Sequence, residues 1–475
     1  MQPFKMRSSK ETISENLAGK DINSLFWHYA LPAIVASAAS SLYNIIDRAF
    51  IGNGVGPLAI AGLALTFPVM NLTVALGTLV SAGASAIISI RLGEKSHALA
   101  AATLGNCLML NLAIGLFFSM LFLVFLDPIL NLFGASQDTL PYARDFLQII
   151  LAGNVVSHVF FGLNNIMRAS GHPAKAMVSI LLTIGVNLLL APTFIFLFKW
   201  GIRGAAIATV LSQCCGLIWV LAHFFSKSST LRFQKEGFKI SGRIIKDIFA
   251  IGLSPFIIHC STCIIVILIN LQLKRYGDIE LSGCLLNGKT VAGGDLAVGA
   301  FGIINSIAGF MVMVLFGMAQ GMQPIVGYNY GAGHYDRVRK ALRTAVLCAT
   351  ATAAACELVC LCFPNAIARI FTADRQIAAV TTQGLQLYMS MFLFIGFQVV
   401  ASTFFQAINK APVSILLSMT RQLFCLVPCL IVLPGIFGTR GVWLSQAASD
   451  LASALIAAAV LFHHLYRRHL LSVRQ

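Results

Sequence analysis

Long apolar stretches, each separated from the next by a short group of charged, Gly or Pro residues, run from about residue 24 to residue 466. Each stretch can cross a bilayer as a helix, which takes about 20 mainly apolar residues. Only 11% of the residues are charged, whereas soluble domains carry roughly 25%. The sequence therefore predicts an all-α integral membrane protein and excludes a soluble cytosolic enzyme.

The apolar stretches number twelve and divide into two sets of six. We expect membrane spans near residues 24–48, 57–82, 97–126, 141–166, 176–198 and 204–225, and again near 247–273, 295–323, 340–363, 378–405, 413–434 and 441–466. The predicted organisation is an N-terminal cytoplasmic segment at 1–23, an N-lobe at 24–225, an inter-lobe linker at 226–246, a C-lobe at 247–466 and a basic cytoplasmic tail at 467–475.

The distribution of basic residues predicts the orientation of the chain in the membrane. Residues 1–23 are polar and lack the apolar region and cleavage site of a signal peptide, so the first span is expected to be retained. The termini and the connections on their side carry 22 Lys and Arg, and the opposite connections carry nine. Because basic loops face the cytoplasm, both termini of this multi-pass inner-membrane protein should be cytoplasmic. The net charge of +16 thus reports orientation and gives no reason to expect nucleic-acid binding.

The two halves of the chain resemble each other at an almost constant offset. The same interval in the numbering separates Gly83 from Gly321, Gly93 from Gly331, Phe133 from Phe371, Gln148 from Gln386, and Leu58-Ala59-Ile60 from Leu296-Ala297-Val298. Since each half has six spans, the repeats should be parallel and related by an axis along the membrane normal. The second half is slightly longer, and its extra residues are expected in an outer loop within 274–294.

Motifs of enzymes and metal sites are absent from the sequence. There is no phosphate-binding loop, no His-Glu-x-x-His and no paired Cys motif, because Cys260-x-x-Cys263 stands alone in an apolar helix. Most of the twelve cysteines lie in apolar stretches and are expected to be buried hydrophobes without disulfides. The sequence therefore predicts a protein that is not an enzyme and needs no cofactor.

One acid occurs in the first span. Ser37, Ser40, Asn44 and Asp47 follow one another at spacings of three or four, so they share one face of a helix. An ionisable side chain within a span is costly and therefore marks a candidate functional site. The alternative is an Asp at the outer end of the span that is exposed to water beside Arg48.

Span four also has a polar face, formed by Asn154, His158, Phe161, Asn165 and Arg168. Such a face can line a pathway, but it can equally hold helices together through hydrogen bonds. The second interpretation is favoured for Asn154 and Asn165. His158 could titrate near neutral pH, although a single His is more often a packing residue.

In the second half, Glu357 and Asp450 are the only acids well inside spans. Gln383, Gln386 and Ser390 form a short polar face on span ten. Glu357 could line a cavity, whereas the small residues around Asp450 also fit tight helix packing. Arg144 and Arg421 are the basic residues that do not fall in the connections.

The sequence resembles the multidrug and toxic compound extrusion (MATE) transporters. The resemblance extends along nearly the whole chain and rests on a combination of motifs: Tyr43-Asn44-Ile45-Ile46-Asp47-Arg48-Ala49-Phe50-Ile51-Gly52, Arg91-Leu92-Gly93, Arg168-Ala169-Ser170-Gly171-His172-Pro173, Gly204-Ala205-Ala206-Ile207-Ala208-Thr209, Gln323-Pro324 and Asn329-Tyr330-Gly331-Ala332-Gly333.

The resemblance implies two six-helix lobes and cation-driven export of amphipathic, often cationic compounds. It also implies a cation site in the N-lobe that uses Asp47, Asn187 and Thr209. Many relatives have another acid or amide one turn after the span-five Asn, where this chain has Ala191 followed by Pro192. Some branches use acids on spans seven and ten, where this chain offers His259, Asn270 and Gln386 but no carboxylate.

The leading functional prediction is multidrug efflux by antiport with H⁺ or Na⁺, with Na⁺ at Asp47 as the one conceivable metal ion. Small-molecule drugs and the lipid bilayer are the expected partners of a chain that should act as a monomer. Possible polar residues of the drug cavity are Tyr43, Asn44, Asn154, His158, Glu357, Gln383 and Gln386.

Three rival functions were weighed against efflux. A lipid-linked precursor flippase should present a clearly cationic cavity, yet the basic residues lie almost wholly in connections. A membrane enzyme or scaffold lacks support, because no catalytic cluster occurs. A major-facilitator carrier should have a charged loop between spans two and three, which is absent around Arg91 to Lys95.

Overall fold

The computed structural model describes residues 17, 19–226, 229–280, 285–286, 289–290, 292–372 and 374–467 of the protein. Most of the predicted N-terminal segment at 1–23, residues 468–475 of the predicted tail, Lys227 of the linker and Cys284 of the outer loop lie outside the described residues.

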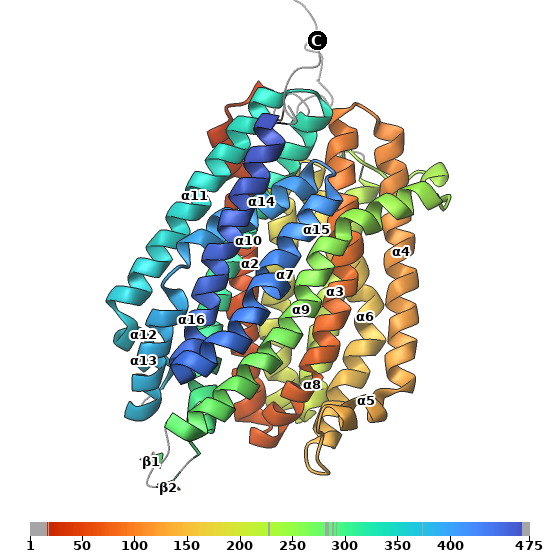
Figure 1. Ribbon diagram of the computed structural model, residues 1–475. Helices are drawn as coiled ribbons and strands as arrows, with labels where there is room; N and C mark the ends of the chain where they lie inside the picture. The colour runs from red at the N-terminus through yellow and green to blue at the C-terminus, as the bar shows by residue number, and fades with distance from the viewer. Residues whose placement is uncertain are drawn as a thin grey trace, which may run out of the picture.

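Helices make up nearly all of the described chain (Figure 1). The first half contains α2 (Ile22–Gly54), α3 (Pro57–Gly93), α4 (His97–Val124), α5 (Leu126–Leu132), α6 (Leu140–Ala169), α7 (Pro173–Pro192), the π-helical turn η1 (Thr193–Leu197) and α8 (Gly201–Phe225). Proline occupies the first or second position of α3, α6 and α7, where a backbone N–H would have no hydrogen-bond acceptor within the helix, so its absence costs nothing. The side chain of Asp21 caps α2 by accepting from Asn23 N at 3.0 Å.

The second half repeats this order. It contains the 3₁₀ turn η2 (Lys235–Phe238), α9 (Gly242–Glu280), the strands β1 (Leu285–Leu286) and β2 (Lys289–Thr290), α10 (Gly293–Gly331), α11 (Tyr335–Cys362), α12 (Pro364–Phe371), α13 (Arg375–Met389), α14 (Leu393–Ala407), α15 (Ala411–Met419), the π-helical turn η3 (Thr420–Leu426), α16 (Val427–Phe462) and the π-helical turn η4 (His463–Arg467). The short helices α5 and α12 begin at Leu126 and Pro364, which are separated by the same interval as the repeated motifs, in agreement with the predicted repeat.

The number of spans agrees with the predicted twelve-helix architecture. Ten helices of the described chain are long and apolar enough to cross a membrane, and α13 with α14 forms one further span bent by 51°. The helical stretch from Ala411 to Leu465 reverses at Gly438, where the backbone has φ 57° and ψ −136°. Arg421 and Asp450 on its two arms pair at 3.0 Å, although a straight helix between them would span roughly 40 Å. The stretch therefore supplies two spans.

Two local features differ from the predicted spans. Span ten is broken between Met389 and Leu393, where a continuous helix was expected. The predicted outer loop at 274–294 is partly helical, because α9 continues to Glu280, and it contains the antiparallel pair of β1 and β2.

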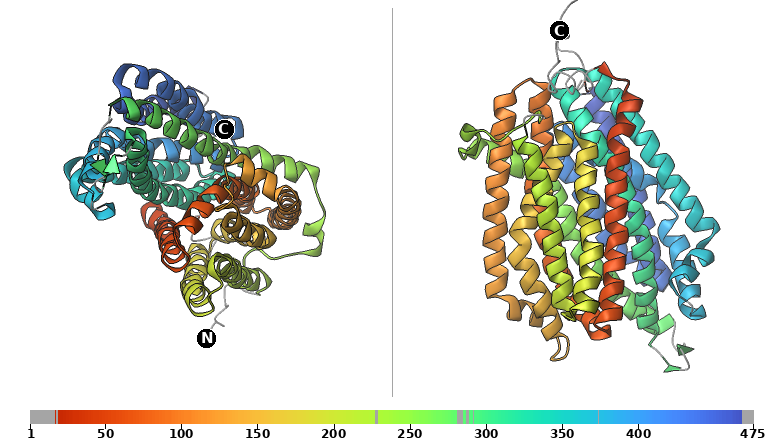
Figure 2. Two further views of the ribbon diagram at one scale, coloured as in Figure 1. Left: turned by 90° about the horizontal axis from the view of Figure 1, so that it is seen from below. Right: turned by 180° about the vertical axis from the view of Figure 1, so that it is seen from behind.

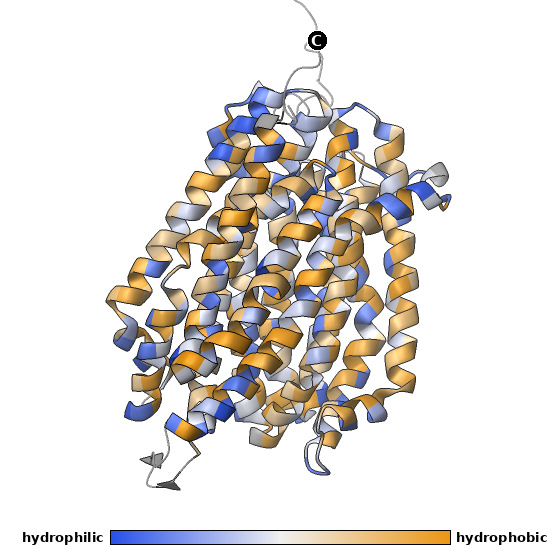
Figure 3. Ribbon diagram, viewed as in Figure 1, coloured by the Kyte–Doolittle hydropathy of each residue, from blue (hydrophilic) through white to orange (hydrophobic). Residues whose placement is uncertain are grey.

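The two halves of the chain form two lobes that lie side by side (Figure 2). The N-lobe comprises α2–α8 and the C-lobe comprises α9–α16. Apolar residues dominate the helices along most of their length (Figure 3), and many large ones are exposed, such as Val124, Leu189 and Ile218. Such a surface requires hydrocarbon around it, so the protein is a multi-pass membrane protein.

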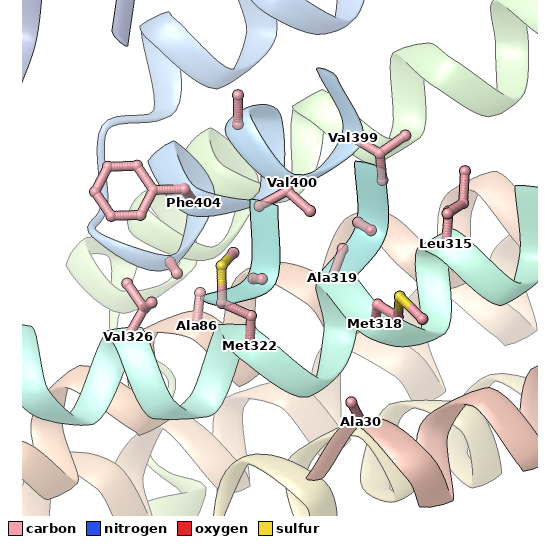
Figure 4. Packing of buried hydrophobic residues seen from close by; sticks show 14 of the residues in the cluster. Ala30, Ala86, Leu315, Met318, Ala319, Met322, Val326, Val399, Val400 and Phe404 are labelled. Atoms are coloured by element: carbon pink, nitrogen blue, oxygen red, sulfur yellow. The ribbon is translucent and has the colours of Figure 1, made fainter. Parts of the chain in front are cut away.

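The main core joins the lobes through α10. Met318 and Met322 of α10 lie between Ala30 of α2 on one side and Val400 and Phe404 of α14 on the other (Figure 4). All five side chains are at most 3% exposed. Methionine has a flexible, unbranched side chain and therefore fills irregular gaps between helices such as these.

Glycines bring the lobes into contact in the half of the bundle near the end at which α2 begins and α16 ends, which we call the terminal end. A Cβ added to Gly252 of α9 would lie 1.6 Å from Leu79 O of α3, and one added to Gly83 of α3 would lie 2.1 Å from Ile248 O of α9. A Cβ added to Gly321 of α10 would lie 2.5 Å from the Ala30 Cα of α2. Only residues without a side chain allow the backbones to approach so closely.

Contact between α2 and α10 is lost toward the opposite end, which bears β1 and β2 and which we call the hairpin end. A Cβ added to Gly299, Gly302 or Gly309 of α10 would meet no atom within 4 Å. Asn305 and Ser306 on the same part of α10 are exposed. The interface is therefore closed at the terminal end and open between these helices at the hairpin end.

Polar contacts reinforce the closure at the terminal end. Arg337 Nη2 of α11 donates to Leu17 O at 3.0 Å and to Lys20 O at 2.8 Å. Lys340 Nζ pairs with Asp21 Oδ1 at 2.7 Å. These contacts tie the start of the N-lobe to α11 of the C-lobe.

The turn after α6 holds a His whose titration affects stability. His172 lies between two spans, with its ring centroid 4.5 Å from that of His223. Partial burial, together with the nearby Lys175 charge, lowers the pKa of His172 from 6.5 to about 4. The folded protein therefore keeps this ring neutral at pH values where the unfolded chain protonates it.

We predict that replacing Gly252 by Ala lowers the thermal unfolding temperature of the purified protein in detergent, because the added methyl group collides with Leu79 O. Overpacking of this kind costs about 1–3 kcal/mol. Gly309→Ala is the matched control, since its methyl group meets no atom within 4 Å. Equal unfolding temperatures of the two variants would contradict the close approach of α3 and α9.

We also predict that His172→Asn reduces acid destabilisation. The pKa of His172 is lower in the folded state, so the stability it contributes is present above pH 6.5 and is lost as the pH falls toward about 4. The measurement is the unfolding temperature of both proteins across this range. The wild type should lose more stability than the variant, and parallel curves would rule out the role of His172.

Candidate functional site

The carboxylate of Asp47 lies on α2 toward the hairpin end and is partly buried. Its Oδ1 atom is fully buried and has no hydrogen-bond partner within the described part of the chain. Arg48 follows it in the sequence, but the Arg48 side chain is exposed, so it does not enclose the carboxylate. Asp47 is therefore neither surrounded by water nor neutralised by a contacting basic group, as the alternative interpretation of this residue required.

Tyr43 connects Asp47 to the neighbouring helix. It precedes Asp47 by four residues and therefore lies one helical turn away on the same face of α2. Its hydroxyl group interacts with the side chains of both Asp47 and Thr209. Thr209 belongs to α8, so this contact links the first and sixth spans.

Asn187 of α7 completes the group. Its side chain is 1% exposed, and its Nδ2 atom donates to Thr209 Oγ1 at 3.2 Å. Thr209 in turn donates its hydroxyl proton to Ala205 O at 3.0 Å. The Asn187 Oδ1 atom is buried without a partner among the residues that the structure describes. Asp47, Tyr43, Thr209 and Asn187 thus form one connected cluster, which we call the N-lobe cluster.

The chemistry of the N-lobe cluster suits a small cation. Asp47 Oδ1 and Asn187 Oδ1 are two buried oxygen acceptors that lack a donor. Leaving a buried acceptor unpaired costs about 1–3 kcal/mol. A proton on the carboxylate, or a hard cation such as Na⁺ held by the oxygen atoms, would remove part of this cost.

The position one turn after Asn187 supplies no oxygen atom. Ala191 is 0% exposed and packs in an apolar cluster with Ile51 and Ile195. The helix changes to the π-helical turn η1 directly after Pro192, a feature that is frequent at functional sites. Asp47 is consequently the only acid of the cluster. The other described acids of the N-lobe lie apart from the cluster: Glu94, Asp127 and Asp138 are at or beyond helix ends, and Asp145 in the second turn of α6 pairs with Arg203 at 2.8 Å.

The predicted polar face of α2 is divided in the structure. Ser37 and Ser40 are partly buried, and Ser40 donates to Ala36 O of its own helix at 2.8 Å. Asn44 is exposed. These side chains lead toward Asp47 along α2 but make no recorded contact with the N-lobe cluster.

The polar residues in the middle of α6 do not join this cluster. Asn154 is 4% exposed and donates to Ser119 Oγ of α4 at 3.2 Å, which agrees with its interpretation as a link between helices. His158 is buried beside Gly77 of α3 and Gly115 of α4. Neither residue contacts Asp47 in any recorded interaction.

Further along α6, Asn165 accepts from Arg168 Nη2 at 2.6 Å, and Arg168 also donates to Gln320 of α10. Gln320 belongs to the C-lobe, so the polar face of span four ends in a link between the lobes.

The polar residues predicted on span ten lie at the helix surface. Gln383 and Gln386 are both exposed. With its amide group oriented to satisfy both side chains, Gln383 accepts from Arg440 Nε at 2.9 Å, and Gln386 donates to Leu361 O at 3.4 Å. Both contacts connect α13 to its neighbours within the C-lobe.

Glu357 has a defined structural partner. It is 8% exposed, and its Oε2 atom accepts from Leu393 N at 2.7 Å at the start of α14. Sequence reasoning noted Arg421 and Asp450 separately but missed that they form an ion pair. The sequence places one basic and one acidic residue within two consecutive spans, and this could have suggested the ion pair.

The sequence model of the MatE family matches residues 32–193 and 284–431, which together are more than half of the chain. The multidrug export protein MepA of Staphylococcus haemolyticus (strain JCSC1435) is 26% identical over 435 residues, which are 92% of each chain. MepA of Staphylococcus aureus (strain MSSA476) is 24% identical with the same coverage.

Solved structures with the same fold include an outward-facing multidrug resistance MATE family transporter of the MOP superfamily. It has a TM-score of 0.86 and 24% identity, and the match covers 96% of this chain and 97% of that chain. A MOP superfamily transporter from Pyrococcus furiosus has the same TM-score and coverage at 23% identity. At this level of identity the likeness establishes the fold.

We predict that Asn187→Leu lowers the thermal unfolding temperature of the purified protein less than Asn154→Leu does. Each amide donates one hydrogen bond at 3.2 Å, but only Asn187→Leu also removes a buried oxygen atom that has no donor. If Asn187→Leu were the more destabilising of the two, Asn187 would be held by packing and not reserved for a ligand.

Proposed function

The chain belongs to the MatE family, and from that premise we propose that it exports amphipathic, often cationic compounds by antiport with H⁺ or Na⁺. A member of this family is a transporter and not an enzyme. Export of drugs is the activity for which its relatives in two Staphylococcus species are named. The fold of a MATE family transporter, shared along 96% of the chain, supports the same activity.

The observation that carries the coupling mechanism is the pair of unpaired buried oxygen atoms in the N-lobe cluster, Asp47 Oδ1 and Asn187 Oδ1. A cation that enters from the hairpin end neutralises Asp47 and is held with the help of Asn187 and Thr209. Because this cation stabilises the state that is open at the hairpin end, it promotes release of the drug there. Its departure at the other side resets the carrier.

The membrane potential can drive this exchange. One charge that moves through 100 mV supplies about 2.3 kcal/mol, and about 1.4 kcal/mol corresponds to a factor of ten. A single coupled cation therefore supports a gradient of roughly 40-fold for an uncharged drug at this potential. The ratio rises if an ion concentration gradient is added. Exchange of one cation for one monovalent cationic drug moves no net charge, so the concentration gradient of the coupling ion drives that exchange.

Orientation follows from the basic residues and from the interface between the lobes. The terminal end carries the basic connections, such as those with Arg91, Arg337 and Lys340, and we assign it to the cytoplasm of a cell with an inner membrane. The closed glycine interface at this end and the separation of α2 from α10 at the hairpin end support an outward-open state. Alternating access then requires the lobes to separate at Gly252 and Gly321.

The lipid-linked precursor flippase is the alternative function. Such a substrate carries phosphate charges and needs unpaired cations in the cavity. Arg144 pairs with Asp127 at 3.3 Å, and Arg421 pairs with Asp450 at 3.0 Å. Because both exceptional arginines already face carboxylates, efflux of cationic compounds remains the better supported proposal. A single chain contains both lobes, so a monomer suffices for it.

We predict that Asp47→Asn in proteoliposomes abolishes drug accumulation driven by an imposed proton or sodium gradient. Drug accumulation should fall to the passive level, because an amide cannot gain a proton or supply a negative charge to Na⁺. Ethidium fluorescence during separate collapse of each gradient also identifies the coupling ion.

Asp138→Asn is the matched control, since Asp138 is an exposed acid of the same lobe. It should transport as the wild type does. Undiminished gradient-driven transport by Asp47→Asn would refute the proposed role of this carboxylate.

A further inference from the structure

The C-lobe contains a buried cluster of charged residues that the N-lobe mechanism does not use. Arg421 Nε in η3 lies 3.0 Å from Asp450 Oδ1 in α16. Gln446 Nε2 donates to the same oxygen atom at 3.0 Å. Asp450 is 1% exposed and Glu357 of α11 is 8% exposed. We call Glu357, Arg421, Gln446 and Asp450 the C-lobe cluster.

The charges of the C-lobe cluster do not balance. Glu357 is close enough to Asp450 for the two carboxylates to interact electrostatically. Arg421 compensates one negative charge, and Tyr388 of α13, which also faces Asp450 and Arg421, is a neutral phenol. One negative charge therefore remains when both carboxylates are ionised. An unbalanced charge within the hydrocarbon region is costly, so one additional positive charge would stabilise this cluster.

One atom of the cluster is free to receive that charge. Asp450 Oδ1 already accepts two hydrogen bonds, whereas Asp450 Oδ2 is buried and has no partner among the described residues. If the acid served packing alone, both oxygen atoms would be expected to have donors, as buried polar groups usually do. The unpaired oxygen atom gives the cluster a free acceptor for a ligand.

The backbone around the cluster is irregular. Glu357 Oε2 accepts from Leu393 N at 2.7 Å, next to the 51° bend between α13 and α14. Arg421 lies in the π-helical turn η3, and Ser449 Oγ donates to Arg421 O at 2.8 Å. Broken spans and π-helical turns in transporters commonly surround ion sites. Two such features meet at this cluster.

A small cavity with a mixed apolar and polar lining borders the cluster at Arg421. Its volume is about 50 Å³, enough for at least one water molecule. It is lined by Ser254 of α9, Phe316 of α10, Gln398 and Gln406 of α14, and Arg421. Arg421 thus contacts both this cavity and Asp450.

We propose that the C-lobe cluster is a second cation site, which binds one monovalent cation, either H⁺ or Na⁺, at Asp450 Oδ2. It differs from the N-lobe cluster in lobe, helices and residues, and its ligand is held against an arginine. The role of this cluster as a second coupling site rests on the proposed antiport function. Binding of the cation can be tested without transport.

The test compares four purified full-length proteins in detergent: wild type, Glu357→Gln, Asp450→Asn and Asp47→Asn. Glu357→Gln removes the surplus charge and keeps the Arg421–Asp450 pair, so it should fold even if Asp450→Asn does not. Infrared difference spectra between acid and alkaline pH detect protonated carboxyl groups. Thermal unfolding in NaCl against KCl detects Na⁺ binding, because a ligand of the folded state raises the unfolding temperature.

Two results support the site and distinguish the ions. For a proton site, Glu357→Gln and Asp450→Asn lose one pH-dependent carboxyl band that Asp47→Asn retains. For a sodium site, the same two variants lose an Na⁺-dependent increase in unfolding temperature that Asp47→Asn retains.

Wild-type behaviour of Glu357→Gln in both assays would overturn the second site. That outcome leaves the antiport proposal intact, since the latter fails only if Asp47→Asn still transports against a gradient.

Discussion

The free-energy cost of leaving charged or polar atoms without partners in hydrocarbon determines how the polar side chains of this structure are arranged. Most polar side chains inside the spans have found partners, as Asn154 has in Ser119 and Gln383 in Arg440. Other buried polar atoms of the described spans also lack partners, among them Asn111 Oδ1, Asn270 Oδ1 and both ring nitrogens of His158, but Asp47 and Asp450 are the described carboxylates within the spans that have an unpaired buried oxygen atom. Each belongs to a group of polar side chains contributed by more than one helix. Stability alone gives no reason to keep such atoms, and binding of a cation does.

The internal repeat determines how the two lobes contact each other. Gly83 and Gly321 occupy equivalent positions in the two repeats, and each brings its helix against the first helix of the other lobe, α9 and α2 respectively. The two contacts are therefore related by the pseudo-symmetry of the two repeats, as the two halves of the interface are in a symmetric dimer. Closely packed glycines offer little resistance to separation because few side chains interlock there. The same contacts can thus close the terminal end in one state and part in the other.

Sequence reasoning predicted the parts of this structure that depend on local composition. Hydropathy located the spans, and the constant offset between matching motifs located the repeat, because both properties are carried by neighbouring residues. The contact of Asn187 with Thr209 was expected from family resemblance, and the structure brings these two residues within 3.2 Å. The break in span ten at residues 390–392 could not be predicted, since that segment contains neither Pro nor Gly. The reversal at Gly438 lies between the predicted spans 413–434 and 441–466, but hydropathy does not give the register of two antiparallel helices, so hydropathy alone could not predict the Arg421–Asp450 pair.

If a cation at Asp47 promotes release of the drug, binding of the drug should in turn promote release of the cation, and drug-induced cation release measures this coupling most directly. A substrate drug is added to the purified protein in weakly buffered detergent solution, and released H⁺ or Na⁺ is measured with a pH indicator or a sodium electrode. By reciprocal linkage, drug binding should displace about one cation from the N-lobe cluster of the wild type and none from that cluster in Asp47→Asn. Equal release from the two proteins, or drug binding without any release from the wild type, would contradict the account.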